Sequence, residues 1–222
     1  MSPHGSVPPR PRSAASCPDC ALARAGVFEG MLGSATEPCA LQCVAVEDRA
    51  QLPPEWFERY AFGIVRRGVV VRERVSGPTG ERTAVDAAGP GAYLPLRSGR
   101  TRDASGGYAA SRVLLCLYPR PAFEPAAHGS EAASDLLGLQ GEAIERLERI
   151  ADARGRASGP EKVAAMLEVL GETVTQRDGS PRLLSNLQQR DLAALLQLRP
   201  ETVSRALRRI EAGEPEAGDG EG

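Results

Sequence analysis

The alternation of apolar and polar residues divides the chain into a strand-rich first part and a helical second part. From about residue 41 to residue 118, apolar positions form short runs separated by Gly-rich turns, and Tyr60, Phe62 and Ile64 alternate with smaller or polar neighbours. The segment 77–80 reads as a turn, and a second apolar run, residues 113–117, ends just before Pro119. Short strands with such turns predict an antiparallel β-barrel or roll.

Beyond residue 130 the apolar period becomes helical. Apolar residues recur at steps of seven, three and four within 130–154, namely Leu137, Ile144, Leu147 and Ala151. This predicts a helix of roughly 35 Å with a narrow apolar seam. Such a seam suits pairing with the same helix of a second subunit, and the alternative is a helix that lies along its own β-domain.

Three shorter helices are predicted after a break at residues 155–160. They cover 161–170, 188–196 and 200–211, and only the three residues 197–199 separate the last two. Two short helices joined by such a turn form a helix-turn-helix unit. The overall class is therefore α+β.

The last of these helices has two chemically distinct faces. An apolar stripe, expected to be buried, comprises Val203, Leu207 and Ile210 with Ala206 at its edge. Polar residues suited to DNA occupy the other side, namely Glu201, Ser204, Arg205, Arg208 and Arg209. Arginine donates two hydrogen bonds to guanine and glutamate accepts one from cytosine, while the last two arginines are placed for phosphates. The alternative is an ordinary amphipathic helix with a solvated face, but the preceding helix and the tight turn favour DNA recognition.

The segment 187–196 followed by 200–205 resembles the DNA-binding domain of the Crp/Fnr transcription regulators. The order of parts agrees over residues 40–212, and the segment 60–71 resembles the central β-hairpin of that family. The pattern Glu-x-x-Ser-Arg resembles the Fnr branch. The resemblance implies that Glu201, Ser204 and Arg205 read a half-site, and that a homodimer binds an inverted repeat in double-stranded DNA and contacts RNA polymerase.

The patterns and the resemblance together predict a division of the chain into five parts, with a disordered first part because Pro, Ser and Arg without apolar spacing cannot bury a core. These are a disordered tail (1–16), a cysteine-bearing, cyclic-nucleotide-binding-like β-roll sensor domain (17–128), a dimerisation helix (129–158), a helix-turn-helix domain (159–213) and an acidic tail (214–222). Three features depart from the family: Gln197 stands in the turn where glycine is usual, Arg199 precedes the recognition helix in place of a Ser or Thr cap, and no evident β-wing follows. Fewer phosphate contacts would weaken DNA binding.

Composition narrows the function classes. The 222 residues are 41% hydrophobic with a formal net charge of −2, so a DNA-binding surface has to be local. Two histidines argue against His-rich zinc sites and against most acid–base enzymes, so we expect no catalytic activity. The longest apolar run, 113–118, is far shorter than a membrane span, and residues 1–16 do not form a secretory signal. We therefore expect a cytoplasmic protein without membrane contact.

Five cysteines suggest thiol or metal chemistry, because an odd number cannot all pair internally. They are Cys17 and Cys20 in a C-x2-C pair, Cys39, Cys43, and Cys116 on an apolar strand. Taken alone, the pair fits a zinc half-site or a redox dithiol, and Cys116 fits a small buried residue. The resemblance to oxygen-sensing Fnr proteins implies a [4Fe–4S] cluster on Cys17, Cys20, Cys39 and Cys116, with Cys43 as the substitute for Cys39.

A cyclic nucleotide is not expected as the signal. Family members that bind one carry a Gly-Glu pair and a later Arg followed by Ser or Thr, and the segments 91–96 and 105–110 have neither. The sequence thus predicts a homodimeric transcription regulator responsive to oxygen, nitric oxide or redox state. The alternatives are a metal-free regulator that answers a small ligand and, remotely, a thiol oxidoreductase using Cys17 and Cys20, which leaves the recognition helix unexplained.

Overall fold

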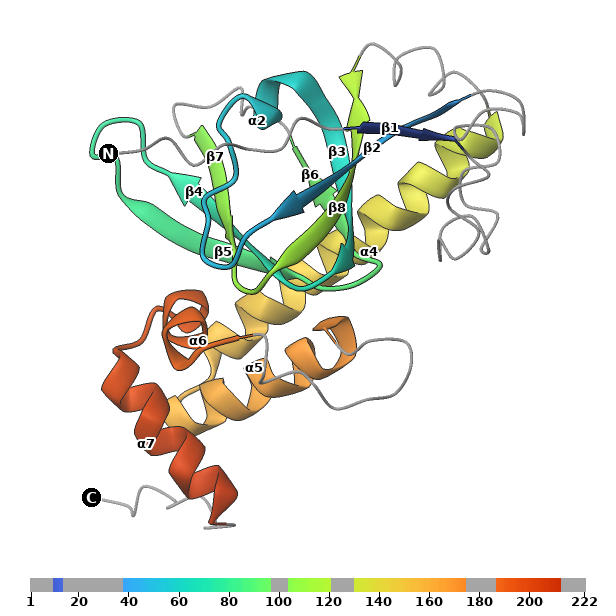
Figure 1. Cartoon of the computed structure of the whole chain (residues 1–222). Coiled ribbons are helices and arrows are strands. Elements are labelled where there is room, and N and C mark those ends of the chain that lie inside the picture. The colour runs from blue at the N-terminus through green and yellow to red at the C-terminus, as the bar shows by residue number, and fades with distance from the viewer. Residues whose placement is uncertain (1–9, 14–37, 97–103, 121–129, 175–186, 213–222) are drawn as a thin grey trace, which may run out of the picture.

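The computed structural model describes residues 10–13, 38–96, 104–120, 130–174 and 187–212, which form a β-roll followed by four helices (Figure 1). Within the roll, one short helix, α2 (Trp56–Arg59), lies between the second and third strands. The strands are β1 (Arg10–Ser13), β2 (Pro38–Val46), β3 (Tyr60–Arg67), β4 (Val70–Val75), β5 (Arg82–Ala88), β6 (Tyr93–Pro95), β7 (Ala104–Ala109) and β8 (Val113–Pro119). The later helices are α4 (Ser130–Gly155), α5 (Gly159–Val174), α6 (Gln189–Leu196) and α7 (Pro200–Glu211).

Two antiparallel sheets make up the roll. Their strand orders are β1-β2-β8-β3-β6 and β5-β4-β7. Alternate residues of β8, among them Leu115 and Leu117, point into the core between the sheets, so Cys116 and Tyr118 lie on the opposite face of their sheet. Both faces are covered, because every residue of the segment 60–65 is buried. The α+β class with an N-terminal β-roll is confirmed.

The segment 60–71 is not the hairpin that the resemblance implies. Strand β3 pairs with β6 and β8, whereas β4 pairs with β5 and β7 in the other sheet. Gly68 makes the corner between the two sheets with φ of +78°, and a Cβ there would lie 2.4 Å from the carbonyl oxygen of Arg112. Only glycine fits this corner without displacement of the backbone. The hairpin in this region is β4 and β5, joined by the predicted turn.

A second correction concerns the N-terminal tail. Residues 10–13 were expected to be disordered, because Pro, Ser and Arg cannot bury an apolar face. They form β1 instead and pair with β2 in antiparallel register, with Arg10 opposite Cys43. Strand pairing depends on backbone hydrogen bonds, which this composition can still provide.

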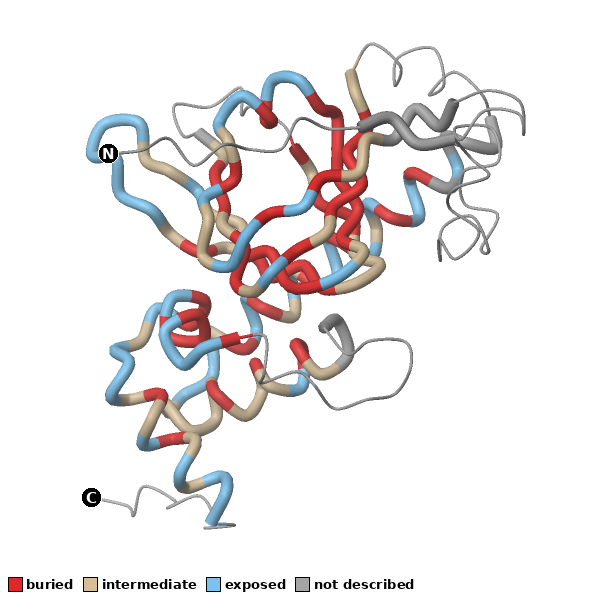
Figure 2. The backbone as a smooth tube through the Cα atoms, in the orientation of Figure 1, coloured by how far each residue is buried: buried red, intermediate tan, exposed pale blue. Residues whose placement is uncertain are grey.

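One apolar core joins the roll to the helices. It contains Val69 and Ala84 from the roll, Ile150 from α4, Met166 from α5, and residues of α6 and α7 (Figure 2). The buried stripe of α4 faces the roll and the following helices, and it comprises Leu136, Leu139, Ala143, Ile150 and Ala153. Within the described residues, no helix is both long enough and apolar enough to cross a membrane.

The break predicted between the long helix and the helices after it is a tight connection with a helix cap. Helix α4 ends at Gly155, and Ser158 precedes α5. The hydroxyl of Ser158 accepts a hydrogen bond from the backbone N–H of Glu161, whose carboxylate accepts one from the backbone N–H of Ser158 at 3.4 Å and one from that of Ala157 at 3.0 Å. These reciprocal contacts satisfy donors that the first turn of α5 leaves open.

A buried ion pair fixes α4 to the roll. The guanidinium of Arg146 on α4 donates to both oxygens of Asp86 on β5, at 2.7 and 2.9 Å, and to the carbonyl oxygen of Tyr93 at 3.2 Å. Arg146 is 5% exposed and Asp86 is 0% exposed. Arg72 lies 3.7 Å from the same carboxylate. Loss of Asp86 would therefore leave the buried Arg146 without its countercharge, and the pair ties α4 to the roll.

Candidate nucleic-acid interface

Helices α6 and α7 form the predicted helix-turn-helix unit. Gln197 ends α6 in the left-handed conformation, with φ of 56°, and its N–H donates to carbonyl oxygens of α6. Arg199 precedes α7 in an extended conformation without a side-chain cap, and Pro200 takes the first helical position. The turn between the two helices therefore forms with Gln197 in place of the usual glycine and with Arg199 in place of a Ser or Thr cap.

The apolar face of α7 is buried over its first part only. Val203 and Ala206 are buried and Leu207 is half-buried, as expected. Ile210 was expected to be buried but is 39% exposed. The reason is that the last turn of α7 extends beyond α5 and α6 (Figure 1).

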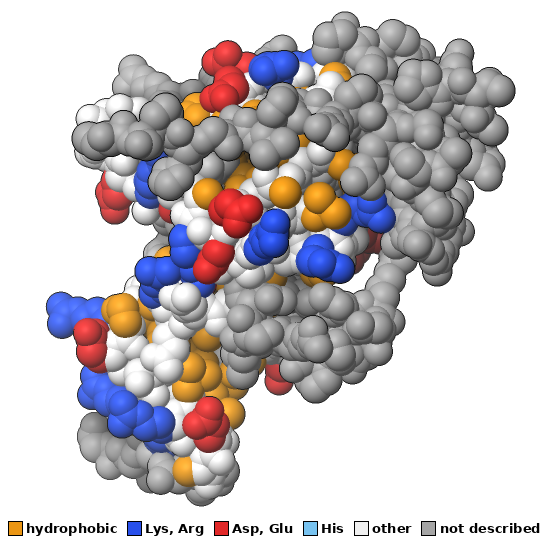
Figure 3. Space-filling model, viewed as in Figure 1, with side chains coloured by type: hydrophobic (Ala, Val, Ile, Leu, Met, Phe, Trp, Pro, Cys, Tyr) orange, Lys and Arg blue, Asp and Glu red, His pale blue; other side chains and the backbone are white. Residues whose placement is uncertain are grey.

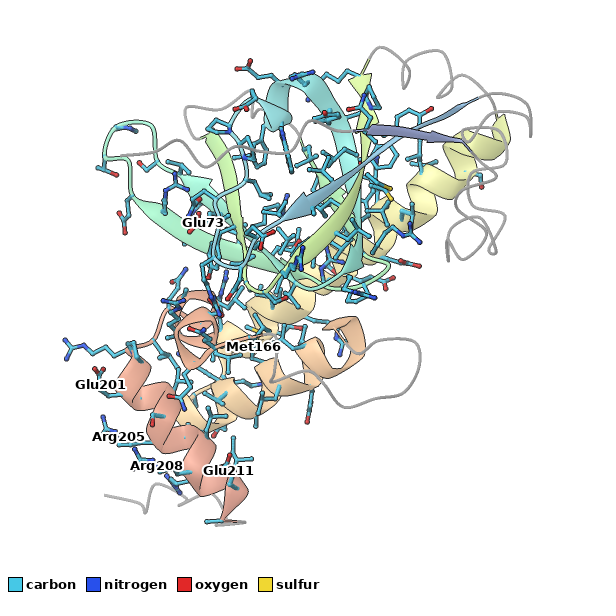
Figure 4. The ribbon with its side chains drawn as sticks, in the orientation of Figure 1. Glu73, Met166, Glu201, Arg205, Arg208 and Glu211 are labelled. Atoms are coloured by element: carbon cyan, nitrogen blue, oxygen red, sulfur yellow. The ribbon has the colours of Figure 1, made fainter. Side chains whose placement is uncertain are left out.

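The opposite face of α7 presents its polar groups to solvent. Glu201, Arg205 and Arg208 are exposed, and Ser204 is half-buried. The side chains of Glu201, Arg205 and Arg208 project from the side of α7 that faces away from the rest of the molecule (Figure 4). Arg208 donates to the hydroxyl of Ser204 at 3.2 Å, and Arg205 makes a long contact of 3.4 Å with the carbonyl oxygen of Glu201.

Basic side chains lie in a row along α7 (Figure 3). Acidic side chains also lie near the upper and lower ends of this row in the same view, so the positive surface is local, on a chain with net charge −2. Arg209 is half-buried at the edge of the row. An arginine fork and a carboxylate on an exposed helix face can donate to guanine and accept from cytosine in a major groove.

A shallow hollow in this surface includes one residue that the sequence analysis does not single out. The hollow is lined by Gln189, Pro200, Glu201, Ser204, Arg205 and Arg208. Gln189 is exposed at the start of α6, next to the start of α7. A glutamine can hydrogen-bond an adenine edge or a phosphate, and its place at a helix N-terminus suits the latter.

Asp191 connects the helix-turn-helix unit to the roll. Its carboxylate, on the first turn of α6, accepts two contacts of 2.8 Å from one nitrogen of Arg49, one of 2.8 Å from the Tyr108 hydroxyl, and one of 2.7 Å from the backbone N–H of Gln188. Burial and the hydrogen bond to Asp191 raise the pKa of Tyr108 above its ordinary value. Asp191 is 1% exposed.

Arg49 reaches this carboxylate from an uncommon backbone conformation. Its φ is 63°, in the left-handed region, and its N–H donates to the carbonyl oxygen of Ala109 at 2.8 Å. A second arginine, Arg154 on α4, adds a bridge by donating to the carbonyl oxygens of Leu195 on α6 and Ala84 on β5. Arg49 and Tyr108 of the roll, together with Arg154 of α4, therefore hold α6 against the roll.

The four residues of the predicted seam lie on the surface of α4. Leu137 is 69% exposed and Ile144 is 55% exposed, while Leu147 is half-buried and Ala151 is exposed. A different stripe of the same helix packs on the roll. One stripe of α4 thus packs within the chain, as expected for a helix that lies along its own β-domain. The predicted seam for pairing with a second subunit lies on another stripe and stays uncovered in the single chain.

The structure describes the surroundings of two of the five cysteines. Cys17 and Cys20 lie outside the described residues, and for Cys39 only its backbone position on β2 is given. Cys43 and Cys116 pair across β2 and β8, with their Sγ atoms 3.3 Å apart. Within the part of the chain that is described, no three His, Cys, Asp or Glu side chains are grouped to hold a metal ion.

This contact bears on the expected iron–sulfur cluster. In a four-iron cubane each thiolate ligates a different iron, so ligating sulfurs are kept apart by two metal–sulfur bonds and an iron–iron edge. Two sulfurs in contact do not match that arrangement. As described, the contact of Cys43 with Cys116 therefore does not fit both of these cysteines as ligands of one such cluster.

Comparisons with known proteins place the fold. Neither the family models nor the curated proteins give a match to the sequence. The fold is similar to FixK2 from Bradyrhizobium japonicum, with a TM-score of 0.60 and 22% identity over 80% of this chain and 89% of that one. It is also similar to a cyclic nucleotide-binding domain containing protein from Listeria monocytogenes (TM-score 0.60, 12% identity, 78% and 83% covered). A third similar structure is TTHB099, a CRP-family transcriptional regulator from Thermus thermophilus (TM-score 0.51, 14% identity, 76% and 84% covered).

Proposed function

We propose that the protein is a sequence-specific, DNA-binding transcription regulator of the Crp/Fnr type. One observation carries the proposal: the second helix of a helix-turn-helix unit presents Glu201, Ser204, Arg205 and Arg208 on one outward face while Val203 and Ala206 anchor the other. The likeness to a CRP-family transcriptional regulator supports it. The role is binding rather than catalysis, and it is exercised on double-stranded DNA in the cytoplasm.

The proposed active unit is a homodimer that pairs through α4. The large aliphatic side chains Leu137 and Ile144 stand exposed seven residues apart, in line with Leu147 and Ala151, on a helix whose other face is already packed. A two-fold axis along this seam would present two copies of α7. Two recognition helices would read half-sites about one helical turn apart, roughly 10 base pairs from centre to centre.

Selection from a random double-stranded DNA library with the full chain tests this function. We expect an enriched inverted repeat, followed by measured affinities for that site and for a scrambled one. Arg205→Ala should weaken the specific site by about 5- to 150-fold, because a two-pronged contact with guanine contributes about 1–3 kcal/mol of discrimination. Arg208→Ala should weaken both sites and lower the salt slope by about one, as expected for loss of a phosphate contact.

Arg59→Ala is the matched control. Arg59 is also an exposed arginine at a helix end, but it lies on α2, at the opposite end of the molecule from α7 (Figure 1). Its replacement removes the same charge and should leave DNA affinity unchanged. Absence of any enriched sequence, or equal losses for the Arg59 and Arg205 variants, would contradict the proposed function.

The signal that we propose is redox state, oxygen or nitric oxide, sensed through the cysteines. A [4Fe–4S] cluster on Cys17, Cys20, Cys39 and Cys116 would supply a group that reacts with such oxidants. Cys116, buried on a strand of the roll, is the member of this set whose side chain is described. Anaerobic purification with iron and acid-labile sulfide analysis should find about four of each per chain, and the Cys17→Ser/Cys20→Ser variant should lose both.

The competing proposal keeps DNA binding without a metal, with a small ligand as the signal. In that case, an iron-free protein would bind its selected site equally with and without air, and the Cys17→Ser/Cys20→Ser variant would keep its DNA affinity and its response. A thiol oxidoreductase remains the remote alternative, and insulin reduction dependent on Cys17 and Cys20 would reveal it. RNA polymerase is the further proposed partner, which transcription from a template carrying the selected site would test.

A further inference from the structure

The contact between Cys43 and Cys116 has the geometry of a disulfide site. The two residues are direct partners in the antiparallel ladder of β2 and β8, and the Sγ atoms are 3.3 Å apart. Directly opposite residues in such a ladder have Cα atoms about 4.5–5.5 Å apart, which lies inside the range that disulfides span. Formation of the roughly 2.05 Å bond requires the sulfurs to approach by roughly 1.3 Å, with no change of register.

Both thiols are on the same face of the sheet. Val44 and Val46, one and three residues after Cys43, point into the core, as do Leu115 and Leu117 on either side of Cys116. Because side chains alternate along a strand, the two cysteines share the face away from that core. Neighbouring pairs on either side keep the two strands in register, namely Gln42 with Leu117 and Val44 with Leu115.

The two thiols differ in access to solvent. Cys43 is half-buried, whereas Cys116 is 1% exposed. An oxidant from solvent therefore meets Cys43 first, and Cys116 is positioned to react with the oxidised sulfur. This division of roles is the one that a peroxide-reactive cysteine and a resolving cysteine require.

We propose that Cys43 and Cys116 are a reversible oxidation site that forms an intramolecular disulfide with a hydroperoxide. The sulfur of Cys43 attacks the O–O bond, which breaks to give a sulfenic acid on Cys43 and one molecule of alcohol, or water from hydrogen peroxide. The sulfur of Cys116 then attacks the Cys43 sulfur, and the hydroxyl leaves as water with the thiol proton of Cys116. Two thiols lose two hydrogens and two electrons, and one hydroperoxide is reduced. The disulfide uses Cys116, which the proposed cluster would also use, so it forms only in the iron-free chain.

Closing this bond ties together residues 73 positions apart in the sequence. A crosslink over so long a loop restricts the unfolded chain more than the folded one, in which the strands are already paired. The oxidised protein should therefore melt several degrees higher than the reduced protein, and dithiothreitol should reverse the shift.

The test uses the full chain, purified with a chelator, treated with one equivalent of hydrogen peroxide and alkylated before non-reducing tryptic digestion. We expect a linked pair made of the peptide 25–49, which contains Cys43, and the peptide that begins at Val113, which contains Cys116. Cys39 lies in the first of these peptides, so the Cys39→Ser variant makes the assignment unambiguous. It is also the matched control, because it removes another cysteine of β2 and should keep both the crosslink and the melting shift.

Cys43→Ala should abolish the crosslink and the melting shift while the reduced variant keeps its fold, as read by circular dichroism. Cys116→Ala should also abolish the crosslink and leave Cys43 as a sulfenic acid that an added thiol or dimedone captures. The proposal is overturned if Cys43 links to Cys17, Cys20 or Cys39 instead. It is equally overturned if folded wild-type protein accumulates Cys43 sulfinic acid with Cys116 still alkylatable, or if the melting shift survives in Cys43→Ala.

Discussion

The Asp191→Ala substitution removes the carboxylate that joins the β-roll to the helix-turn-helix unit. Four contacts of 2.7–2.8 Å converge on this side chain from Arg49, Tyr108 and the backbone of Gln188. Loss of one member of a buried ion pair costs about 3–5 kcal/mol. Arg49 is 23% exposed and also lies 3.4 Å from the exposed Asp48, so its charge is not fully stranded, and we expect the low end, about 3 kcal/mol.

Urea denaturation and thermal melting measure the effect. A loss of about 3 kcal/mol corresponds to a fall in melting temperature of roughly 6–12 °C for a chain of this size. Tyr108→Phe removes one hydrogen bond from a half-buried hydroxyl and should cost about 1 kcal/mol.

Asp48→Ala is the control, because Asp48 contacts the same arginine but is 58% exposed, and it should cost less than about 0.5 kcal/mol. Equal losses for the Asp48 and Asp191 variants would refute the reasoning, since burial could not then be what distinguishes the two carboxylates.

Three further predictions follow from the described contacts. Above about pH 10 the unfolded chain releases the Tyr108 proton whereas the folded chain retains it, so stability should fall with rising pH by less than about 1.4 kcal/mol per unit, and Tyr108→Phe should flatten that slope in urea titrations. Gly68→Ala should lower the unfolding free energy by at least about 2 kcal/mol, whereas Gly80→Ala, also at positive φ but with open space, should cost only about 1 kcal/mol; equal losses in urea titrations would count against the corner argument. Ile144→Glu should shift the protein toward monomer in analytical ultracentrifugation with little change in melting temperature, and an unchanged sedimentation coefficient would count against the seam.

Local sequence patterns predict most of the helices and strands, because the residues that favour each of them lie within it or next to it. The bounds 200–211 of α7 follow from Pro200 at the first helical position and from the apolar spacing behind it, and the structure has the same bounds. The alternation of Tyr60, Phe62 and Ile64 likewise predicts β3. A strand pattern does not say which sheet receives the strand, however, so the placement of β3 and β4 in different sheets needs the structure.

For the candidate DNA-binding surface, too, the local features are predicted from the sequence and the long-range contacts are not. The polar face of α7 is predicted because helical spacing alone places Glu201, Arg205 and Arg208 together. Ile210 is assigned wrongly because spacing says which face a residue occupies but not how far a neighbouring helix reaches. Arg49 and Asp191 are in contact although 142 positions separate them in the sequence, and a local sequence pattern cannot predict such a contact. A Gln-x-x-Asp pattern at the start of α6 could have marked Asp191 as a cap, though not as a partner of the roll.

The ion pair of Arg146 with Asp86 has a consequence for how α4 can vary. Arg146 lies between Ile144 and Leu147 in the sequence. The ion pair that binds α4 to the roll and the uncovered aliphatic stripe therefore belong to the same turns of the helix, and the angle between them around the helix axis is fixed. One residue inserted between Leu137 and Arg146 would rotate everything upstream of it by about 100° relative to the ion pair, whereas seven inserted residues would restore the phase to within about 20°. Length changes in this helix should therefore be tolerated in whole heptads and not in single residues.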